Sequence, residues 1–253
     1  MTKRILVRTS YFSEPTIERR VFEGDDVDVH ASRAETPGEL AEDVETANAI
    51  AVLNSTDPTP ASFFERTTEL RVLASYSVGV NHIDVDAATD HDVGILNVPG
   101  YCADEVSTHA VALLLACVRK IPLLDDHVTE GGWDWSTLKP THRLRGATLG
   151  LVGFGDIARR VAQKAAGFGL EVVATDPYVS AEAMNEAGVE KVSFEELVDR
   201  SRYVSVHAPL TDETHHLFDR SAFERLSEGA VLVNTSRGAL VDEEALYDAL
   251  TEG

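Results

Sequence analysis

Short apolar runs alternate with amphipathic segments along the first hundred residues. The apolar runs predict strands at residues 4–8, 26–30, 49–53, 72–75 and 94–98. The segments between them have the apolar spacing of helices, near residues 14–22, 38–47, 60–69 and 83–90. Because strands that alternate with helices are typical of a parallel sheet covered by helices, the pattern predicts an α/β domain over residues 1–99.

A second α/β domain is predicted after the break at Pro99 and Gly100. It begins with a helix over residues 104–120 whose middle is almost wholly apolar, which indicates burial between domains or subunits. A loop with two tryptophans follows at 131–140, and strands are then predicted at 148–152, 171–174, near 191, 202–206 and 230–234, before a last helix at 242–250. The predicted fold is two doubly wound parallel-sheet domains, the second over residues 100–253, with a ligand-binding cleft between them.

The stretch from residue 147 to 176 carries the most specific motif. Gly153, Gly155 and Ala158 follow a predicted strand at the spacing G-x-G-x-x-A and open a predicted helix. In such a turn the first glycine makes the bend, the second lets the backbone approach a diphosphate, and the alanine packs the helix on its strand. The motif predicts a dinucleotide site, with phosphates on the helix amides from Asp156 onward.

Asp176 indicates which dinucleotide binds. It ends the strand at 171–174, where a carboxylate can accept hydrogen bonds from an adenosine ribose. A carboxylate there would repel the 2′-phosphate of NADP, and residues 177–180 supply no cation to receive that phosphate. The sequence therefore favours NAD, although Asp176 and Pro177 alone are equally typical of a polar turn.

Two loops at predicted strand ends are candidates for binding an anion. Arg237 follows the strand at 230–234, and its guanidinium could hold a carboxylate in a bidentate pair and polarise a neighbouring carbonyl, but it cannot donate a proton. The alternative is a surface arginine bonded to carbonyls of its own loop. Residues 77–80 are small, so their amides could converge on an anion, or they form a simple turn.

Composition narrows the partners. The formal net charge is −21, with 43 acidic against 22 basic residues, which disfavours nucleic acid and anionic membranes. The longest apolar run, at 111–118, is too short to cross a bilayer, and the N-terminus lacks an apolar signal core. Cys102 and Cys117 form neither a disulfide framework nor a metal-ligand spacing, so we expect a reducing cytoplasm and no metal.

The charge is also unusual in kind, because only five of the basic residues are lysines. An acid-rich and lysine-poor surface favours the hypothesis of a halophilic organism, whose molar salt would screen self-repulsion over a Debye length of about 3 Å. The alternative is an ordinary acidic cytoplasmic protein.

Six separated segments resemble the D-isomer-specific 2-hydroxyacid dehydrogenases, in the order found in that family. The resemblance covers most of residues 70–250 and is greatest to the branch with phosphoglycerate dehydrogenases and C-terminal-binding-protein corepressors. The first 60 residues agree with the family only in the alternation of strands and helices. It implies a flavodoxin-like substrate domain and a Rossmann NAD-binding domain. The segments are SVGVNHIDVDAA, GILNVPGYCADEVSTHAVALLL, LRGATLGLVGFGDIARRVA, VATDPY, VSVHAPLTDETHHLF and VLVNTSRGALVDEEAL.

The resemblance also implies roles for individual residues. Val78 and Gly79 match the loop whose amides hold the substrate carboxylate, and Arg237 matches the arginine that binds and polarises a 2-oxo acid. Tyr101 either shapes the substrate pocket at the mouth of the cleft or packs at the hinge. The implied cofactor residues are Gly153, Gly155 and Ile157 at the diphosphate, Asp176 at the ribose, His207, Ala208, Pro209 and Thr214 around the adenosine, and Val106, Thr235, Ser236 and Arg237 at the nicotinamide.

The implied reaction is hydride transfer between NAD and a 2-oxo or 2-hydroxy acid in a homodimer formed through the apolar helix and the loop at 133–140. In the family, a histidine held by a glutamate moves the proton, and both lie further beyond Arg237 than the 16 residues printed here. We therefore expect a longer dehydrogenase of which this sequence is part. The alternatives are a naturally short NAD-binding regulator without turnover and a formate or phosphite dehydrogenase of the same architecture.

Overall fold

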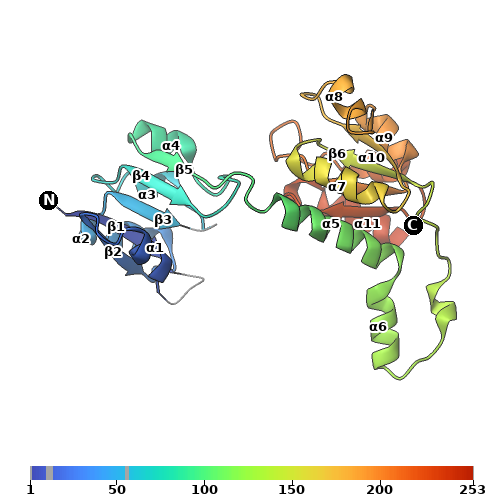
Figure 1. Ribbon diagram of the computed structural model, residues 1–253, viewed down its shortest axis with the longest axis horizontal. Helices are drawn as coiled ribbons and strands as arrows, with labels where there is room; N and C mark the ends of the chain where they lie inside the picture. The colour runs from blue at the N-terminus through green and yellow to red at the C-terminus, as the bar shows by residue number, and fades with distance from the viewer. Residues whose placement is uncertain (1, 10–13, 55–56, 253) are drawn as a thin grey trace. The chain divides into compact units, whose positions relative to one another are not determined.

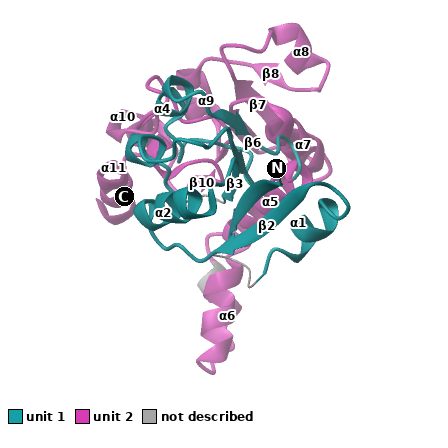
Figure 2. Cartoon of the chain, turned by 90° about the vertical axis from the view of Figure 1, so that its left-hand side faces the viewer, with its two compact units in different colours: residues 1–101 teal, residues 102–253 magenta. Residues whose placement is uncertain are grey.

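The computed structural model describes residues 2–9, 14–54 and 57–252. The chain divides into two compact units, Met1–Tyr101 and Cys102–Gly253, and each is treated by itself (Figure 2). The boundary between the units lies two residues after the position 99 expected from the sequence. Each unit contains one five-stranded sheet in which all paired strands are parallel, which confirms the predicted fold class.

Unit 1 has the strand order β2-β1-β3-β4-β5, which is that of flavodoxin-like folds, so the direction of winding reverses between β1 and β3. Its core is apolar and packs Leu6, Val52 and Leu73 of the sheet against Phe63 and Phe64. The strands are β1 (Lys3–Arg8), β2 (Val27–Ser32), β3 (Ala51–Asn54), β4 (Val72–Ser75) and β5 (Gly94–Leu96), and the helices are α1 (Thr16–Val21), α2 (Pro37–Ala47), α3 (Ala61–Phe64) and α4 (Val85–Asp90).

Helix α3 is shorter than the predicted segment 60–69. Thr67 donates its hydroxyl to the Phe63 carbonyl at 3.1 Å, while its backbone N–H bonds the Phe64 carbonyl instead. A side chain thus satisfies the carbonyl that a continuing helix would use, so the helix ends.

Unit 2 has the order β10-β9-β6-β7-β8, which is the Rossmann arrangement with its reversal between β6 and β9. Figure 1 shows α5 and α7 side by side, and they pack together in the core of this unit. The strands are β6 (Thr148–Val152), β7 (Glu171–Thr175), β8 (Glu190–Lys191), β9 (Tyr203–Val206) and β10 (Val231–Asn234). The α-helices are α5 (Ala103–Val118), α6 (Ile121–Thr129), α7 (Asp156–Ala166), α8 (Ala181–Asn185), α9 (Phe194–Arg200), α10 (Arg220–Arg225) and α11 (Glu243–Glu252), and short 3₁₀ helices cover Trp135–Leu138 and Gly238–Leu240.

The apolar helix predicted at 104–120 ends at Val118, and the sequence analysis missed α6 altogether. Lys120 has a φ of 52°, in the left-handed region, and the chain restarts as α6 at an angle of 60° with a proline in its first turn. Ala110 and Leu114 of α5 are buried within unit 2, whereas α6 has no buried residue and projects away from the body of that unit (Figure 1). No single helix of the described residues is long and apolar enough to span a membrane, and α5 with α6 reaches that length only as a bent pair.

Candidate functional site

Four predicted cofactor residues lie in one row at the carboxyl edge of the unit 2 sheet. The strand register pairs Val152 with Thr175 and with Val206, and Val206 with Asn234. Since the strands are parallel, the residues that follow these positions are neighbours at the same edge. They are Gly153, Asp176, His207 and Thr235.

Gly153 makes a turn that no other residue could make in this setting. Its φ is 85°, and a Cβ built on it would lie 2.8 Å from the Ala208 nitrogen and 2.9 Å from the His207 carbonyl carbon. Both strain and contact therefore require glycine. Gly155 differs, because its conformation suits any residue and no atom lies within 4 Å of a Cβ built on it. The space beside Gly155 is open.

The first turn of α7 presents backbone donors at this edge. Within the described part of the chain, the N–H groups of Asp156, Ile157 and Ala158 have no hydrogen-bond acceptor, and the next donor, Arg159, bonds Gly155. Unpaired N–H groups and the helix dipole together favour a phosphate group at this position. The predicted diphosphate turn therefore has the donors that it needs.

Asp176 has a structural task besides its predicted role at the ribose. One of its carboxylate oxygens accepts the Phe154 N–H at 2.8 Å, and the other accepts the Tyr178 N–H at 2.8 Å. The side chain thus ties the glycine turn to the end of β7, and a carboxylate oxygen can accept more than one hydrogen bond. The contact with Tyr178 is the polar turn considered from the sequence, whereas the contact with Phe154 was not predicted, because it depends on the pairing of β6 with β7.

His207 is a neutral side chain at the same edge. Its Nε2 lies 2.9 Å from the Ser205 hydroxyl, and burial lowers its pKa from 6.5 to about 4. The loop that follows is closed by Thr214, whose hydroxyl donates to the Pro209 carbonyl at 2.7 Å and accepts the Thr211 N–H at 2.8 Å. Ala208 is buried beside the glycine turn.

The loop after β10 is shaped by Asn234. Its amide accepts the Ser236 N–H at 2.9 Å and donates to the Arg237 carbonyl at 2.8 Å, and the Ser236 hydroxyl bonds the Val206 carbonyl at 3.1 Å. Thr235 lies between Asn234 and Ser236, and its hydroxyl is buried and has no hydrogen-bond partner among the described residues. An orphaned hydroxyl at this place fits a polar group of a ligand.

Arg237 is exposed at the end of this loop. One of its five N–H donors bonds the Ser236 carbonyl at 3.0 Å, which is the own-loop contact considered from the sequence. Val106 lies half-buried on α5 of the same unit, and Tyr101, at the end of unit 1, is 61% exposed.

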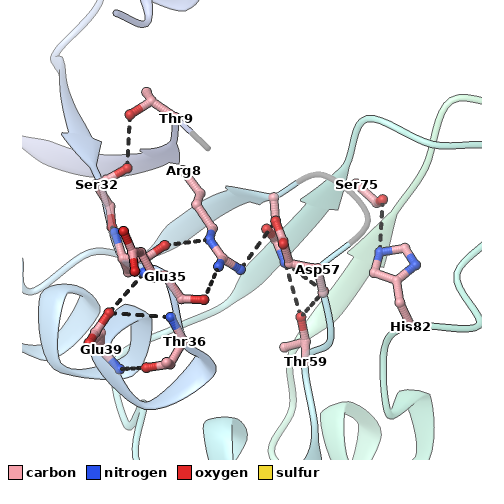
Figure 3. A network of polar contacts seen from close by, with 12 residues as sticks. Arg8, Thr9, Ser32, Glu35, Thr36, Glu39, Asp57, Thr59, Ser75 and His82 are labelled. Carbon is pink, nitrogen blue, oxygen red and sulfur yellow. Dashed lines mark hydrogen bonds and ion pairs between the residues drawn. The ribbon is translucent and has the colours of Figure 1, made fainter. Parts of the chain in front are cut away.

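The carboxyl edge of the unit 1 sheet holds a buried polar network that the sequence analysis did not identify (Figure 3). Arg8 is 3% exposed and donates to the carbonyls of Ala34 and Glu35, each at 2.9 Å, while its Nη1 lies 3.3 Å from an Asp57 oxygen. Asn54, at the end of β3, donates to the Thr59 hydroxyl at 3.1 Å. The network ties the end of β1 to residues 34–35 after β2 and to Asp57 after β3.

The loop of residues 77–80 follows β4 at this edge. Within the described residues, the N–H groups of Val78 and Gly79 donate no hydrogen bond, as a loop that receives an anion requires. Nearby, Ser75 contacts His82 (Figure 3). No group of three or more His, Cys, Asp or Glu side chains in the described ranges is arranged to hold a metal ion.

The residues of unit 2 fit a bound dinucleotide. A Cβ would fill the turn at Gly153, three amides of α7 have no acceptor in the described chain, and the Thr235 hydroxyl is orphaned. Comparison with known proteins agrees with this fit, because residues 111–253 match the family model "D-isomer specific 2-hydroxyacid dehydrogenase, NAD binding domain". The chain belongs to this family.

Three known proteins illustrate the relationship. A glyoxylate reductase of Korarchaeum cryptofilum is 40% identical over 217 residues, which are 85% of this chain and 65% of that protein. A D-3-phosphoglycerate dehydrogenase of Mycobacterium tuberculosis is 39% identical over 230 residues, which are 91% of this chain and 43% of that protein. The structure of a formate dehydrogenase from Staphylococcus aureus with NAD has a TM-score of 0.86 at 27% identity and covers 98% of this chain and 78% of that one. The chain thus spans less than two thirds of these two curated relatives.

Proposed function

We propose that the protein is an NAD-dependent oxidoreductase that interconverts a D-2-hydroxy acid and its 2-oxo acid. The observation that carries the proposal is the row of Gly153, Asp176, His207 and Thr235 beside the unpaired amides of α7, in a chain of this dehydrogenase family. Bound NAD would supply the hydride acceptor at its nicotinamide ring. Asp176 would bind the adenosine ribose and discriminate against the 2′-phosphate of NADP.

The residues of the chain bind and orient the substrate. The amides of Val78 and Gly79 would hold its carboxylate, and Arg237 would bind the same acid and polarise its 2-oxo group. Arginine keeps its proton at ordinary pH, so it stabilises charge and leaves the proton transfer to another group. The relatives named glyoxylate reductase and D-3-phosphoglycerate dehydrogenase support small 2-oxo and 2-hydroxy acids as the substrate class.

Two measurements test this function. Calorimetric titration with NAD and NADP is expected to give binding of NAD and at least tenfold weaker binding of NADP. A version extended to the length of the relatives is expected to oxidise NADH with glyoxylate or hydroxypyruvate, and Arg237→Ala to lose this activity while Arg33→Ala, a change at another exposed arginine, keeps it. Unchanged turnover in Arg237→Ala would refute the role of that residue.

Two alternatives have different outcomes in the same assays. A regulator similar to the corepressors would bind NAD and oxidise NADH with none of the acids, and the dehydrogenases and reductases among the relatives argue against it. A formate dehydrogenase would reduce NAD with formate alone. The panel of acids therefore includes formate and phosphite.

We infer a homodimer formed through α6 and the loop that follows it, in place of the apolar helix at 104–120 that the resemblance implied, because the middle of that helix is buried within unit 2. Ile121, Leu123 and Val128 of α6 are 53%, 62% and 49% exposed, and Trp133 is 92% exposed. An apolar surface of this kind on a projecting segment favours a partner of the same kind. Sedimentation is expected to give a dimer for the wild type and for Val21→Glu in unit 1, and a monomer for Leu123→Glu. A monomeric wild type would contradict the proposal.

We also infer a reducing, salt-rich cytoplasm. Both cysteines are free thiols, and the net charge of −21 with only five lysines supports adaptation to molar salt. The melting temperature is then expected to rise between low and molar KCl. An unchanged melting temperature would contradict the halophilic part of this inference.

A further inference from the structure

Three consecutive carbonyl groups in the loop after β4 accept hydrogen bonds. The Ser77 carbonyl accepts the Val98 N–H at 3.1 Å, and the Val78 carbonyl accepts the side-chain amide of Asn97 at 2.7 Å. The Gly79 carbonyl accepts the hydroxyl of Ser77 at 2.6 Å. Every peptide group from residue 77 to residue 80 is therefore held by its oxygen.

Fixing a carbonyl also fixes the N–H of the same peptide group. A trans peptide is planar, and its N–H points away from its C=O. The three bonded carbonyls therefore orient the N–H groups of Val78, Gly79 and Val80. In the described part of the chain, none of these three N–H groups has an acceptor. Val78 is 41% exposed, so the loop is open to solvent.

A chain of polar side chains lies behind the loop. Ser77 donates its single hydroxyl proton to the Gly79 carbonyl. The Oγ atoms of Ser75 and Ser77 are 2.7 Å apart, so in this hydrogen bond Ser75 donates to Ser77. The Ser75 hydroxyl also lies 3.3 Å from the Nε2 of His82. Hydrogen bonds connected in a chain strengthen one another, so Ser75 and His82 support the bond from Ser77 to Gly79.

We propose that Asn97 and Ser77 are positioning residues that turn the N–H groups of Val78, Gly79 and Val80 onto a carboxylate, so that Val80 supplies a third donor. Ser75 and His82 support Ser77 from behind. This inference deepens the proposed function, on which it rests, by naming what orients the substrate loop. Three N–H groups that are already oriented would bind a carboxylate with little reorganisation.

Oxalate, an unreactive two-carbon dicarboxylate, is the probe for this loop. Titration of the ¹⁵N-labelled chain, at constant ionic strength with chloride as the reference, is expected to shift the amide protons of Val78, Gly79 and Val80 downfield. Asn97→Ala and Ser77→Ala each remove one orienting hydrogen bond and are expected to weaken oxalate binding about fivefold. Ser77→Thr keeps the hydroxyl and is expected to restore the affinity of the wild type.

Two controls separate positioning from folding. Asn185→Ala removes an exposed amide from α8 and is expected to leave oxalate binding unchanged. NAD affinity is expected to be unchanged in every variant, because the changes in unit 1 leave the residues of the cofactor row intact. Wild-type spectra without shifts at Val78, Gly79 and Val80, or shifts that omit Val80, would overturn the inference.

Failure of the proposed function gives a different result. Shifts of all three amides in a protein that reduces no 2-oxo acid would keep the positioning inference and reject the reaction. Reduction of a 2-oxo acid with an unchanged KM in Asn97→Ala and Ser77→Ala would confirm the reaction and reject the positioning inference. A fivefold rise in KM with kcat within twofold supports both.

Discussion

In unit 1 four of the strands end in buried polar side chains that bond the loops and helices around them, whereas in unit 2 the equivalent edge is set by the backbone. The unit 2 edge depends on a left-handed glycine, unpaired amides and a few side chains that fix main-chain groups. The buried polar residues that end β1 to β4 in unit 1 are Arg8, Ser32, Asn54 and Ser75.

Under the proposed function, the two edges receive different groups. A diphosphate needs close approach to the main chain, so side chains are removed or turned aside. A loop that presents amides to a small acid would have to be held from behind, and the side chains of Ser77 and Asn97 bond the carbonyls of this loop. The carboxyl edges of the two sheets should therefore be sensitive to different substitutions. An added methyl group is expected to disrupt the edge of unit 2, and a removed polar group the edge of unit 1.

The largest effect is expected from Gly153→Ala. The new Cβ would meet the backbone of residues 207 and 208 in a conformation that disfavours alanine, which we expect to cost about 3 kcal/mol of unfolding free energy and to abolish NAD binding. Denaturant unfolding and calorimetry measure both. Gly155→Ala is the matched control, because its Cβ has open space, so stability is expected within about 1 kcal/mol while NAD binding weakens about tenfold. Equal stability of the two variants would contradict the comparison.

Arg8→Leu tests the opposite dependence in unit 1. It leaves two carbonyls and Asp57 without their buried cation, and we expect a loss of about 3 kcal/mol of unfolding free energy with NAD affinity unchanged. The exposed Arg4 also bonds a carbonyl, that of Ala47, and Arg4→Leu is expected to cost under about 1 kcal/mol. If the two substitutions cost the same, the buried network does not hold this edge.

A third effect concerns the pH dependence of the unit 2 edge. His207 has a pKa of about 4 in the folded state against 6.5 otherwise, so the unfolded chain binds the proton more readily between these values. Unfolding free energy is then retained above pH 6.5 and falls as the pH drops toward 4, by about 2 kcal/mol because partial solvent access screens the effect. Unfolding curves of the wild type and His207→Gln at several pH values measure this, and parallel pH profiles would reject it.

The smallest effect is expected from Asp176→Ala. It removes the acceptor of the Phe154 and Tyr178 N–H groups, which we expect to weaken NAD binding about tenfold and to narrow the preference over NADP. Asp90→Ala, at an exposed site of unit 1, is expected to bind both cofactors as the wild type does. A preference for NAD that survives intact in Asp176→Ala would assign the discrimination to another residue.

The sequence predicted those parts of the fold that depend on local pattern. Strand β4 has the predicted bounds, and the bounds of β6, α7 and β7 around the glycine motif agree with the prediction to within about one residue. Apolar runs and turn glycines act locally, so a local pattern is enough to predict them. Helix α6 was missed because one left-handed lysine divides an apolar stretch, although Pro122 beside it is a helix-start signal.

The site was predictable residue by residue but not in its contacts. Gly153 and Asp176 stand out in the motif, yet the bond from Phe154 to Asp176 depends on the pairing of β6 with β7. Arg8 is the clearest omission. An arginine at the end of an apolar strand looks like a surface residue, and only the fold brings Ala34, Glu35 and Asp57 around it.

The projecting segment of unit 2 has an optical consequence. Both tryptophans of the chain, Trp133 and Trp135, lie there and are 92% and 70% exposed. Their fluorescence therefore reports on this segment and is insensitive to the cores of both units. Emission of the isolated chain is expected at the long wavelengths of indole in water, to change little when the sheets unfold, and to move to shorter wavelengths when the segment is covered.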